Sequence, residues 1–221
     1  MENLTLLIPA KFESESLPSV LRELKKFNYK ICIILKDTDS ITIDSIKDFD
    51  VEVIQQKGIG YGDALIEGIN YCKTKYFCIF NADGSFNPNE IDGIMKQIEK
   101  NNTDFIFASR YEKNAGSDDD TFVTFVGNYF FSSIGKIFFK LKISDILYTF
   151  VIGNTSKAKS LNLLSKDFRF CVELPIKAKR KNFKIDVFPS FERKRIAGKK
   201  KVNALKDGSL ILKKLVELFL N

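Results

Sequence analysis

Short, uninterrupted apolar runs recur along the chain, and most are separated by segments whose apolar residues have helical spacing. Strands that are apolar throughout, rather than at alternate positions, are typical of a parallel sheet covered on both faces. The alternation of strands with helices favours the same arrangement, because a helix connects each pair of parallel strands. The sequence therefore predicts an α/β fold, a mostly parallel sheet with helices on both faces. The predicted strands cover residues 4–8, 31–35, 51–54, 76–80, 105–108 and 185–188.

The spacing of apolar residues also predicts where the helices lie. In the first half they are expected over residues 17–24, 41–48, 64–72 and 91–98. In the second half they are expected over residues 125–141, 156–164 (capped by Ser156), 172–180 and 206–220. Residues 113–124 are expected to form a polar loop, whose acidic run Asp118 to Asp120 is interpreted as a solvated loop or helix N-terminus rather than a metal site. Residues 145–153 are expected to be irregular. The aromatic-rich helix at 125–141 is interpreted by default as part of the core, and the alternative is a membrane-facing patch.

Polar and charged side chains directly follow several of the predicted strands. Glu13 follows the first strand, Asp37 the second, Asn81 and Asp83 the fourth, and Arg110 the fifth. In an open parallel sheet, ligands bind outside the carboxyl ends of the strands. Carboxylates and an arginine that meet at this edge would suit a nucleotide diphosphate held together with a metal ion.

The turn after the fourth strand reads Asn-Ala-Asp-Gly-Ser, residues 81–85. Along an extended chain, side chains two positions apart point the same way, so Asn81, Asp83 and Ser85 can present three oxygens to one side. Oxygen ligands on a short turn suit a hard divalent cation that also holds phosphate oxygens. On its own this pentapeptide is more simply an ordinary connection, and its neighbours favour the functional interpretation. Because the chain has no histidine, histidine-based catalysis and histidine metal ligands are excluded.

Charge divides the chain into two unlike halves. Residues 1–120 contain 14 Lys and Arg against 21 Asp and Glu, whereas residues 121–221 contain 21 against 7, a net charge of +14. A strongly basic half of this kind predicts an anionic partner, such as nucleic acid, a membrane surface or a phosphorylated substrate. A solvated basic face is the simpler interpretation. Nucleic acid is the least favoured partner, because the basic half contains no recognisable nucleic-acid-binding module.

Features of secreted and membrane-spanning proteins are not expected here. The start of the chain has neither the basic segment nor the small-residue cleavage site of a signal peptide, and no apolar stretch looks long enough to span a bilayer. The four cysteines lack the spacing of metal ligands and suit buried thiols in a reducing compartment. We therefore expect a cytoplasmic protein, and peripheral attachment to the inner face of the cell membrane from the cytoplasmic side is compatible with this expectation.

Beyond these properties, the order of motifs resembles a known family. IPAKFESESL resembles the opening IPAxNExxxL of family 2 glycosyltransferases of the GT-A fold, NADGS resembles their DxD turn, and FIFASRY resembles their strand ending in GSRY. Two segments of the second half, residues 116–150 and 189–215, are similar to the branch related to dolichyl- and polyprenyl-phosphate sugar synthases. The resemblance covers nearly the whole chain and implies one glycosyltransferase domain over 1–221. Within it, residues 1–112 would bind the nucleotide sugar, and the basic residues 113–221 would face the acceptor and the membrane.

The resemblance implies an inverting transfer of a sugar from a nucleotide diphosphate donor, with Mg or Mn as the cofactor. Asp83 would hold the metal with help from Asn81 and Ser85. Arg110, Arg195 and Lys201 would act with Asp83 in catalysis near the phosphates, Gly198 lying in the same basic loop. The implied acceptor is a lipid phosphate or a glycan, at an anionic membrane surface and without nucleic acid. The residues implied to line the nucleotide are Pro9, Ala10, Glu13, Asp37, Ala82 and Asp83.

Several departures from the family pattern leave alternatives open. Asn81, which is neutral, stands where the family has the first acid of the metal motif. Lys36 stands where the family has the first acid after the second strand, and Val151 stands where an arginine is common. These changes are compatible with a catalytically weakened subunit that binds nucleotide sugars. Direct transfer to a hydroxyl of a glycan or glycolipid is a further alternative. That reaction would need a general base, for which Asp145 and Glu173 are the available guesses.

Overall fold

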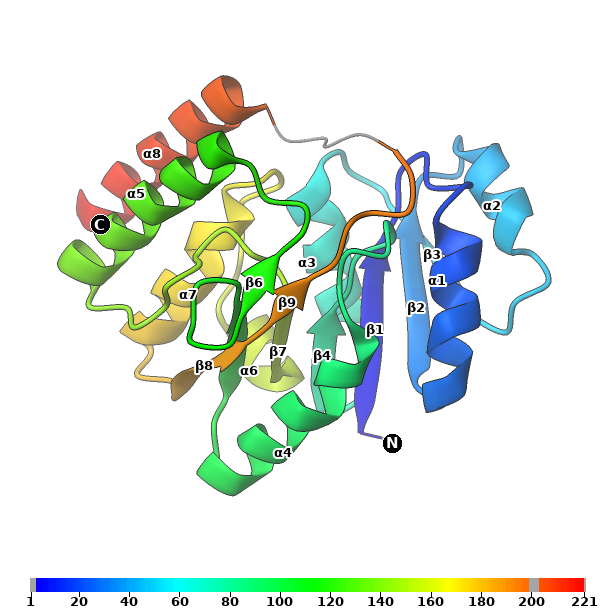
Figure 1. The fold of residues 1–221 in the computed structure, drawn as a ribbon, viewed down its shortest axis with the longest axis horizontal. Helices are drawn as coiled ribbons and strands as arrows, with labels where there is room; N and C mark the ends of the chain where they lie inside the picture. Colours follow the sequence, from blue (N-terminus) through cyan, green and yellow to red (C-terminus); the bar gives the residue numbers. More distant parts are fainter. Residues whose placement is uncertain (1–2, 199–202, 221) are drawn as a thin grey trace.

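The computed structural model of the protein describes residues 3–198 and 203–220. Within these residues, seven strands form one sheet in the order β3-β2-β1-β4-β7-β5-β8 (Figure 1). All of the neighbouring pairs are parallel except those that involve β7. The mostly parallel sheet expected from the apolar runs is therefore confirmed. The strands are β1 (Leu4–Pro9), β2 (Lys30–Leu35), β3 (Glu52–Gln55), β4 (Tyr76–Ile79), β5 (Phe105–Ser109), β7 (Val151–Asn154) and β8 (Ile185–Pro189).

Helices cover both faces of the sheet, also as expected. One buried cluster takes apolar side chains from α1 (Leu17–Leu24), α2 (Ser40–Ile46) and α4 (Ile91–Asn101). The other takes them from α3 (Tyr61–Tyr71), α5 (Phe122–Phe139), α6 (Thr155–Ser160), α7 (Phe170–Arg180) and α8 (Ala204–Leu220). Alternate residues of one strand serve the two clusters, because side chains alternate across a sheet. In β1, Leu7 packs with the second group of helices, whereas Leu6 and Ile8 pack with the first. Two short 3-10 helices complete the set, Lys25–Phe27 and Pro88–Glu90.

Strand β7 corrects the expectation that residues 145–153 are irregular. It lies between β4 and β5 in the interior of the sheet and runs antiparallel to both. The strand has four residues, and only two apolar ones precede Gly153, so the sequence shows no recognisable apolar run. Gly153 is required there, because a Cβ atom would lie 2.5 Å from Cδ1 of Phe105 and 3.0 Å from Cε1 of Phe77.

Local capping and a small ribbon account for two other differences from expectation. Helix α6 is capped by Asn154 rather than by Ser156, because the Asn154 side chain accepts a hydrogen bond from the backbone of Lys157 at 3.1 Å. The expected polar loop at 113–124 contains β6 (Gly116–Ser117), which pairs in parallel with β9 (Phe191–Glu192). Two residues per strand give no periodicity to recognise, so sequence alone could not indicate this ribbon.

Helix α5 was expected to belong to the core, and that default interpretation is wrong for most of its surface. Only Asn128, Phe131, Ser132 and Gly135 are buried among its 18 residues. Contrary to the expectation that no apolar stretch is long enough, α5 is the one helix in the described part of the chain that could cross a bilayer, as judged by length and composition alone. The outer side of this helix is therefore an apolar surface that the described residues leave uncovered.

The packing around Gly153 leads to a prediction for stability. We expect Gly153→Val to lower the free energy of unfolding by about 1–3 kcal/mol, because the added side chain overpacks the contact with two phenylalanines. Gly127→Ala, on the open side of α5 where an added Cβ meets nothing within 4 Å, should instead be neutral or stabilising by up to about 1 kcal/mol. Urea unfolding followed by circular dichroism measures both. Equal stability of the Gly153→Val variant and the wild type would contradict the described packing of β7.

Candidate functional site

Three loops that follow neighbouring strands meet at the carboxyl edge of the sheet. Strand β1 lies between β2 and β4, so the loops that leave these three strands are adjacent (Figure 1). The backbone N–H of Phe12 donates to the carboxylate of Asp39 at 2.7 Å, and that of Glu13 donates to the hydroxyl of Thr42 at 3.1 Å. These bonds fasten the first loop to the start of α2. The expectation that polar residues after the strands gather at one edge is met for these loops.

The turn after β4 is held by its own side chains. Asp83 accepts a hydrogen bond from the backbone N–H of Ser85 at 3.0 Å through its Oδ1 atom. The amide of Asn81 donates to the hydroxyl of Ser85 at 3.3 Å. Gly84 has a φ of +82°, a conformation that side chains with a Cβ rarely adopt. Asp83 is thereby oriented with Oδ1 toward its own turn, and its second oxygen, Oδ2, makes a contact outside it.

That contact comes from a basic segment more than a hundred residues further along the chain. The backbone N–H groups of Arg193 and Ile196 donate to the carbonyls of Ser85 and Asp83, each at 2.8 Å. This pairing lays the segment alongside the turn. It places a guanidinium nitrogen of Arg195 3.4 Å from Oδ2 of Asp83.

Arg195 also binds a second carboxylate. Its Nε and Nη2 atoms lie 3.3 and 2.8 Å from the two oxygens of Asp119. Partial burial acts to lower the pKa of the Arg195 guanidinium, but the hydrogen bond to Asp119 and the charges of Asp83 and Asp119 raise it above its usual value. Arg195 therefore stays cationic and joins two carboxylates from separate loops.

The other predicted nucleotide-binding residues lie around this pair. Ala10 and Ala82 are buried and Pro9 is half-buried. The Glu13 carboxylate accepts from the Ser16 hydroxyl at 2.8 Å. It also lies about 4.0 Å from the position that a Cβ atom of Gly198 would take, so the basic loop extends from the Asp83 turn to the first loop. Lys201, predicted to act in the same loop, lies outside the described residues.

Asp37 and Asp39 differ in their surroundings. Asp37, the acid predicted for the nucleotide pocket, is exposed. Asp39, two residues later, is buried, caps α2 through the backbone of Thr42, and accepts from Phe12. The acid that fastens this loop to the first loop is therefore Asp39 and not Asp37. The role of Asp37 in binding a nucleotide stays a prediction.

Arg110, predicted to meet phosphate, lies in a largely buried cluster of carboxylates. Its Nε and Nη2 atoms donate to the two oxygens of Asp145 at 2.7 and 3.0 Å, and its Nη1 donates to Glu192 at 2.9 Å. Burial acts to lower its pKa, but the hydrogen bond and charge of Asp145, with the charge of Glu192, raise it above the usual value. The guanidinium also lies over the ring of Tyr148, 4.7 Å from its centre. A phosphate contact of Arg110 stays a prediction, and the contacts described here are structural.

The two guesses for a general base are both buried in structural contacts. Asp145 accepts from the Asn128 amide as well as from Arg110. Glu173 accepts from the backbone N–H of Ser165 at 2.7 Å and pairs with Lys177 at 2.7 Å. Burial acts to raise the pKa of Glu173, but the Lys177 contact and the backbone donors lower it below the usual value. Neither carboxylate is described in contact with the Asp83 turn, so neither gains support as a base.

Two residues near the site were not singled out from the sequence. Asp119 was interpreted as part of a solvated acidic run, and only the tertiary pairing with Arg195 reveals its position. Phe12 is 71% exposed and has a left-handed backbone, with φ of 54°. This conformation is costly for a residue with a Cβ atom, and such outliers cluster at functional sites. The one sequence signal is that Phe12 stands where the family motif IPAxNE has asparagine, a residue that adopts the left-handed conformation more readily.

The oxygen atoms of this turn fit a divalent metal that takes most of its ligands from phosphate oxygens and water rather than from the protein. In the described part of the chain, no three His, Cys, Asp or Glu side chains group together as a metal site. Mg²⁺ is usually bound by one or two carboxylates with phosphate oxygens and water, rather than by a cage of protein ligands. Asp83 with Asn81 and Ser85 offers such a partial set of oxygens. The position of Arg195 beside Asp83 shows that this spot already attracts positive charge.

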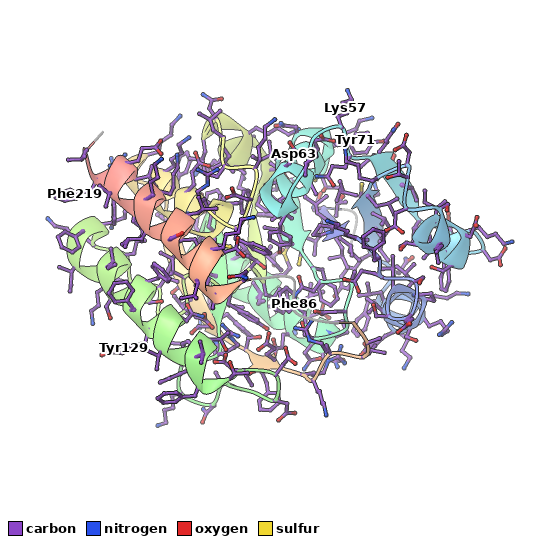
Figure 2. All side chains as sticks on the ribbon, turned by 90° about the horizontal axis from the view of Figure 1, so that it is seen from above. Lys57, Asp63, Tyr71, Phe86, Tyr129 and Phe219 are labelled. Atoms are coloured by element: carbon purple, nitrogen blue, oxygen red, sulfur yellow. The ribbon has the colours of Figure 1, made fainter. Side chains whose placement is uncertain are left out.

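A cleft of about 470 Å³ lies at the opposite edge of the sheet. Its walls include Thr5, Lys30 and Glu52, which stand near the starts of β1, β2 and β3, and Tyr71, which ends α3. Figure 2 shows Tyr71 well apart from Phe86, which follows the Asp83 turn. We place the functional site at the carboxyl edge despite this cleft. Parallel sheets bind ligands there, and the loops with oxygen ligands and the basic segment converge only at that edge among the described residues.

The chain resembles known proteins in sequence and in fold. A family model described as "Glycosyl transferase family 2" matches residues 5–161. Glucosyl-3-phosphoglycerate synthase from Mycobacterium tuberculosis, solved with Mn²⁺, UDP and glucosyl-3-phosphoglycerate, superposes with a TM-score of 0.76 at 10% identity, over 98% of this chain and 80% of that one. Mannosyl-3-phosphoglycerate synthase from Rubrobacter xylanophilus gives a TM-score of 0.65 at 13% identity, over 98% and 72%. At these identities the likeness shows the fold alone, and it confirms the expected GT-A architecture.

The surroundings of Arg110 generate a prediction that separates a structural role from a phosphate contact. We expect Arg110→Ala to reduce the free energy of unfolding by about 3–5 kcal/mol, because the buried charges of Asp145 and Glu192 would lose their cationic partner. Lys113→Ala, at an exposed position nearby, should change it by less than about 0.5 kcal/mol. Thermal and urea unfolding measure both. A stable Arg110→Ala protein that had lost nucleotide affinity would contradict the structural role.

Proposed function

The chain belongs to glycosyl transferase family 2, and from this premise we propose that it transfers a sugar from a nucleotide diphosphate sugar to an acceptor that carries a phosphate. The observation that carries the proposal is the convergence at the Asp83 turn. The loops after β1, β2 and β4 leave neighbouring strands at this edge, Gly198 brings the basic segment close to Glu13, and Arg195 lies beside Asp83. Oxygen ligands and a guanidinium within a few ångströms suit a diphosphate leaving group.

In this proposal the nucleotide lies along the first three loops. Pro9, Ala10 and Ala82 supply the buried or half-buried backbone against which it would pack. Glu13 and Asp37 supply carboxylates that can accept hydrogen bonds from its base or ribose. The structures of the M. tuberculosis synthase with UDP and with UDP-glucose support a nucleotide sugar as the donor class. Residues 1–112 are accordingly proposed as the donor half of one domain that spans 1–221.

Mg or Mn is proposed as the cofactor, held by Asp83 with the weaker ligands Asn81 and Ser85. When bound, such a metal neutralises the diphosphate as it leaves the sugar. Asp83 supplies the charge, while Asn81 brings an amide oxygen without charge. Arg195 keeps the unbound carboxylate of Asp83 paired and is placed to bind a phosphate oxygen. Arg110 orients the loops on either side through Asp145 and Glu192, and Lys201 adds a further cation in the basic loop.

The acceptor is proposed to offer an ionised phosphate oxygen as the nucleophile. Such an oxygen needs no general base, which agrees with a chain without histidine and with the buried positions of Asp145 and Glu173. The synthase from M. tuberculosis is solved with phosphoglyceric acid, so phosphate-bearing acceptors occur on this fold. The resemblance to polyprenyl-phosphate sugar synthases and the net charge of residues 121–221 favour a lipid phosphate, with residues 113–221 as the acceptor half.

A binding subunit without turnover is the second candidate, and one observation favours it. Asn81 stands where the family has an acid, and its amide is used in a hydrogen bond to Ser85. A metal bound there would have a single carboxylate from this turn. Metal-dependent turnover by the purified protein distinguishes an enzyme from such a subunit.

The proposal predicts that nucleotide binding depends on Asp83. We expect Asp83→Asn to weaken Mn²⁺-dependent binding of a nucleoside diphosphate by at least tenfold, because the turn loses its charged ligand. Asp92→Asn, on α4 and away from this edge, serves as a matched control. Isothermal titration with and without Mn²⁺ gives the affinities, and circular dichroism checks the fold. Equal Mn²⁺-dependent affinity in the Asp83→Asn variant and the wild type would refute the metal assignment.

The acceptor is tested by transfer assays with a panel of nucleotide sugars. We expect Mn²⁺-dependent transfer to a short-chain polyprenyl phosphate and none to the matching polyprenol, because the alcohol would need a base that the site does not offer. Phosphoglyceric acid is the soluble arm of the same experiment. Transfer only to phosphoglyceric acid would exclude the lipid acceptor. Transfer to the polyprenol would contradict a phosphate nucleophile, and neither transfer nor donor hydrolysis would favour the binding subunit.

A further inference from the structure

The first and last helices of the basic half lie side by side on one edge of the molecule. Helices α5 and α8 run next to each other at the left of Figure 1, far from α1 and α2. Near their ends, the ring of Phe219 in α8 packs edge-on against Phe138 and Phe139 of α5, with ring centres 5.4 and 6.3 Å apart. Figure 2 shows Tyr129 and Phe219 at the outer rim, away from the centre of the molecule. The two helices thus share one outward-facing side.

The outer side of α5 is apolar along its full length. Its exposed residues include Phe122 at 81% and Ile137 at 69% exposure. Lys136 is the only charged residue between 122 and 139. A surface helix of a soluble protein normally directs charged residues to water, and α5 directs aromatic ones. The exposed apolar residues of this helix are Phe122, Val123, Phe125, Val126, Tyr129, Phe130, Ile137 and Phe138.

Helix α8 extends the same surface. Leu205, Leu212, Val216 and Phe219 are all exposed, and their spacing of seven, four and three residues places them on one side of the helix. Another side, with Ile211 and Leu215, packs into the core. We call the exposed apolar residues of the two helices the α5/α8 face. Contiguous apolar patches of this kind mark interaction sites.

Charge around the α5/α8 face indicates what covers it. Residues 121–144 contain no Asp or Glu and three lysines, Lys136, Lys140 and Lys142, all of which are exposed. In α8, Lys206 and Lys213 are exposed as well. The two acids of α8 are engaged, Asp207 with the backbone N–H of Asn203 and Glu217 with Lys214. An apolar strip flanked by lysines complements anionic lipid headgroups above an acyl layer.

From this combination we propose that the α5/α8 face docks on an anionic lipid bilayer, with both helices lying in the plane of the headgroups. A second copy of this chain fits less well, because it would bring two lysine-rich rims together. A spanning orientation of α5 is excluded by its inner side. Asn128 is hydrogen-bonded to the buried Asp145, and the Ser132 hydroxyl accepts from the backbone of Ile146 at 3.0 Å. The helix is therefore fastened to the core and lies on the membrane rather than across it.

The α5/α8 face is continuous with the candidate site. Helix α5 begins at Phe122, three residues after Asp119, which pairs with Arg195. Helix α8 begins at Ala204, at the end of the basic loop that contains Arg195 and Gly198. Helix α5 therefore starts close to the Arg195 side chain, and docking would hold the segment around Arg195 near the lipid headgroups. This step rests on the proposed function and names the membrane as the place where a lipid-phosphate acceptor is met, whereas docking itself does not depend on it.

The test is cosedimentation of the protein with vesicles of phosphatidylcholine alone and with phosphatidylglycerol added. We expect binding to the anionic vesicles only, weakened by salt, since each lysine near a charged leaflet contributes roughly fivefold to partitioning. Phe130→Glu together with Ile137→Glu should reduce this binding at least tenfold. Ile41→Glu, at a position in α2 that is 71% exposed on the other side of the molecule, is the matched control and should bind as the wild type does. Circular dichroism verifies that all three proteins are folded.

Three outcomes would overturn the inference. The wild type could remain in the supernatant with both vesicle types, or the double variant could bind as tightly as the wild type. Light scattering could also show a dimer of the wild type that the double variant lacks, which would assign the face to a second copy. The proposed function fails separately. We expect Asp83→Asn to keep its vesicle binding, and the double variant to keep its Mn²⁺-dependent nucleotide affinity, so each readout reports on one proposal.

Discussion

A single buried guanidinium, that of Arg110, joins the end of β5 to the segments that build the second half. It binds Asp145, which precedes β7, and Glu192, which belongs to β9. Asp145 in turn binds Asn128 of α5. A buried ion pair is expensive to desolvate and contributes little net stability on its own, but removing one partner leaves the other charge stranded. The cluster therefore fixes where the basic segment and α5 leave the sheet, and both proposed surfaces depend on those positions.

The basic segment shows how this geometry reaches the candidate site. From Glu192 the chain continues directly into Arg193, whose backbone pairs with Ser85. Arg193 also forms a two-pronged ion pair with Glu23 of α1, at 2.8 and 3.0 Å. Arg193 is therefore held by the Asp83 turn through its backbone and by α1 through its side chain. These two contacts restrict where Arg195, two residues later, can meet Asp83. A site assembled in this way needs no cage of protein ligands, because the backbone pairing already positions the charged groups.

The sequence predicted what depends on local pattern. Fully buried strands such as β1 and β4 were recognised because every residue is apolar, and the turn from Asn81 to Ser85 was recognised by its spacing of oxygens. What it could not predict depends on tertiary partners. Strand β7 is four residues long and owes its place to packing against Phe77 and Phe105. Asp119 looked like one acid in a solvated run, and its significance comes entirely from a guanidinium 76 residues away. Helix α5 has a composition that fits a core helix or a surface one, and only the position of its neighbours decides.

The pairing of Asp83 with Arg195 and Asp119 also constrains how a donor can bind. Two carboxylates that approach one guanidinium would repel each other without it, so Arg195 stabilises the unliganded turn. Under the proposed function, a metal-bound diphosphate would bring both a cation for Asp83 and anions for Arg195, and it would therefore replace the existing pair without leaving either charge alone. Neither component alone would replace the pair in this way. A metal without diphosphate would compete with Arg195 for Asp83, and a diphosphate without metal would add negative charge beside two carboxylates. Helix α5 begins three residues after Asp119. Replacement of the Asp83–Arg195–Asp119 contacts by a donor would therefore occur next to the N-terminus of the helix that we propose to dock on the membrane. Donor binding and membrane docking would then share one short, well-anchored connection.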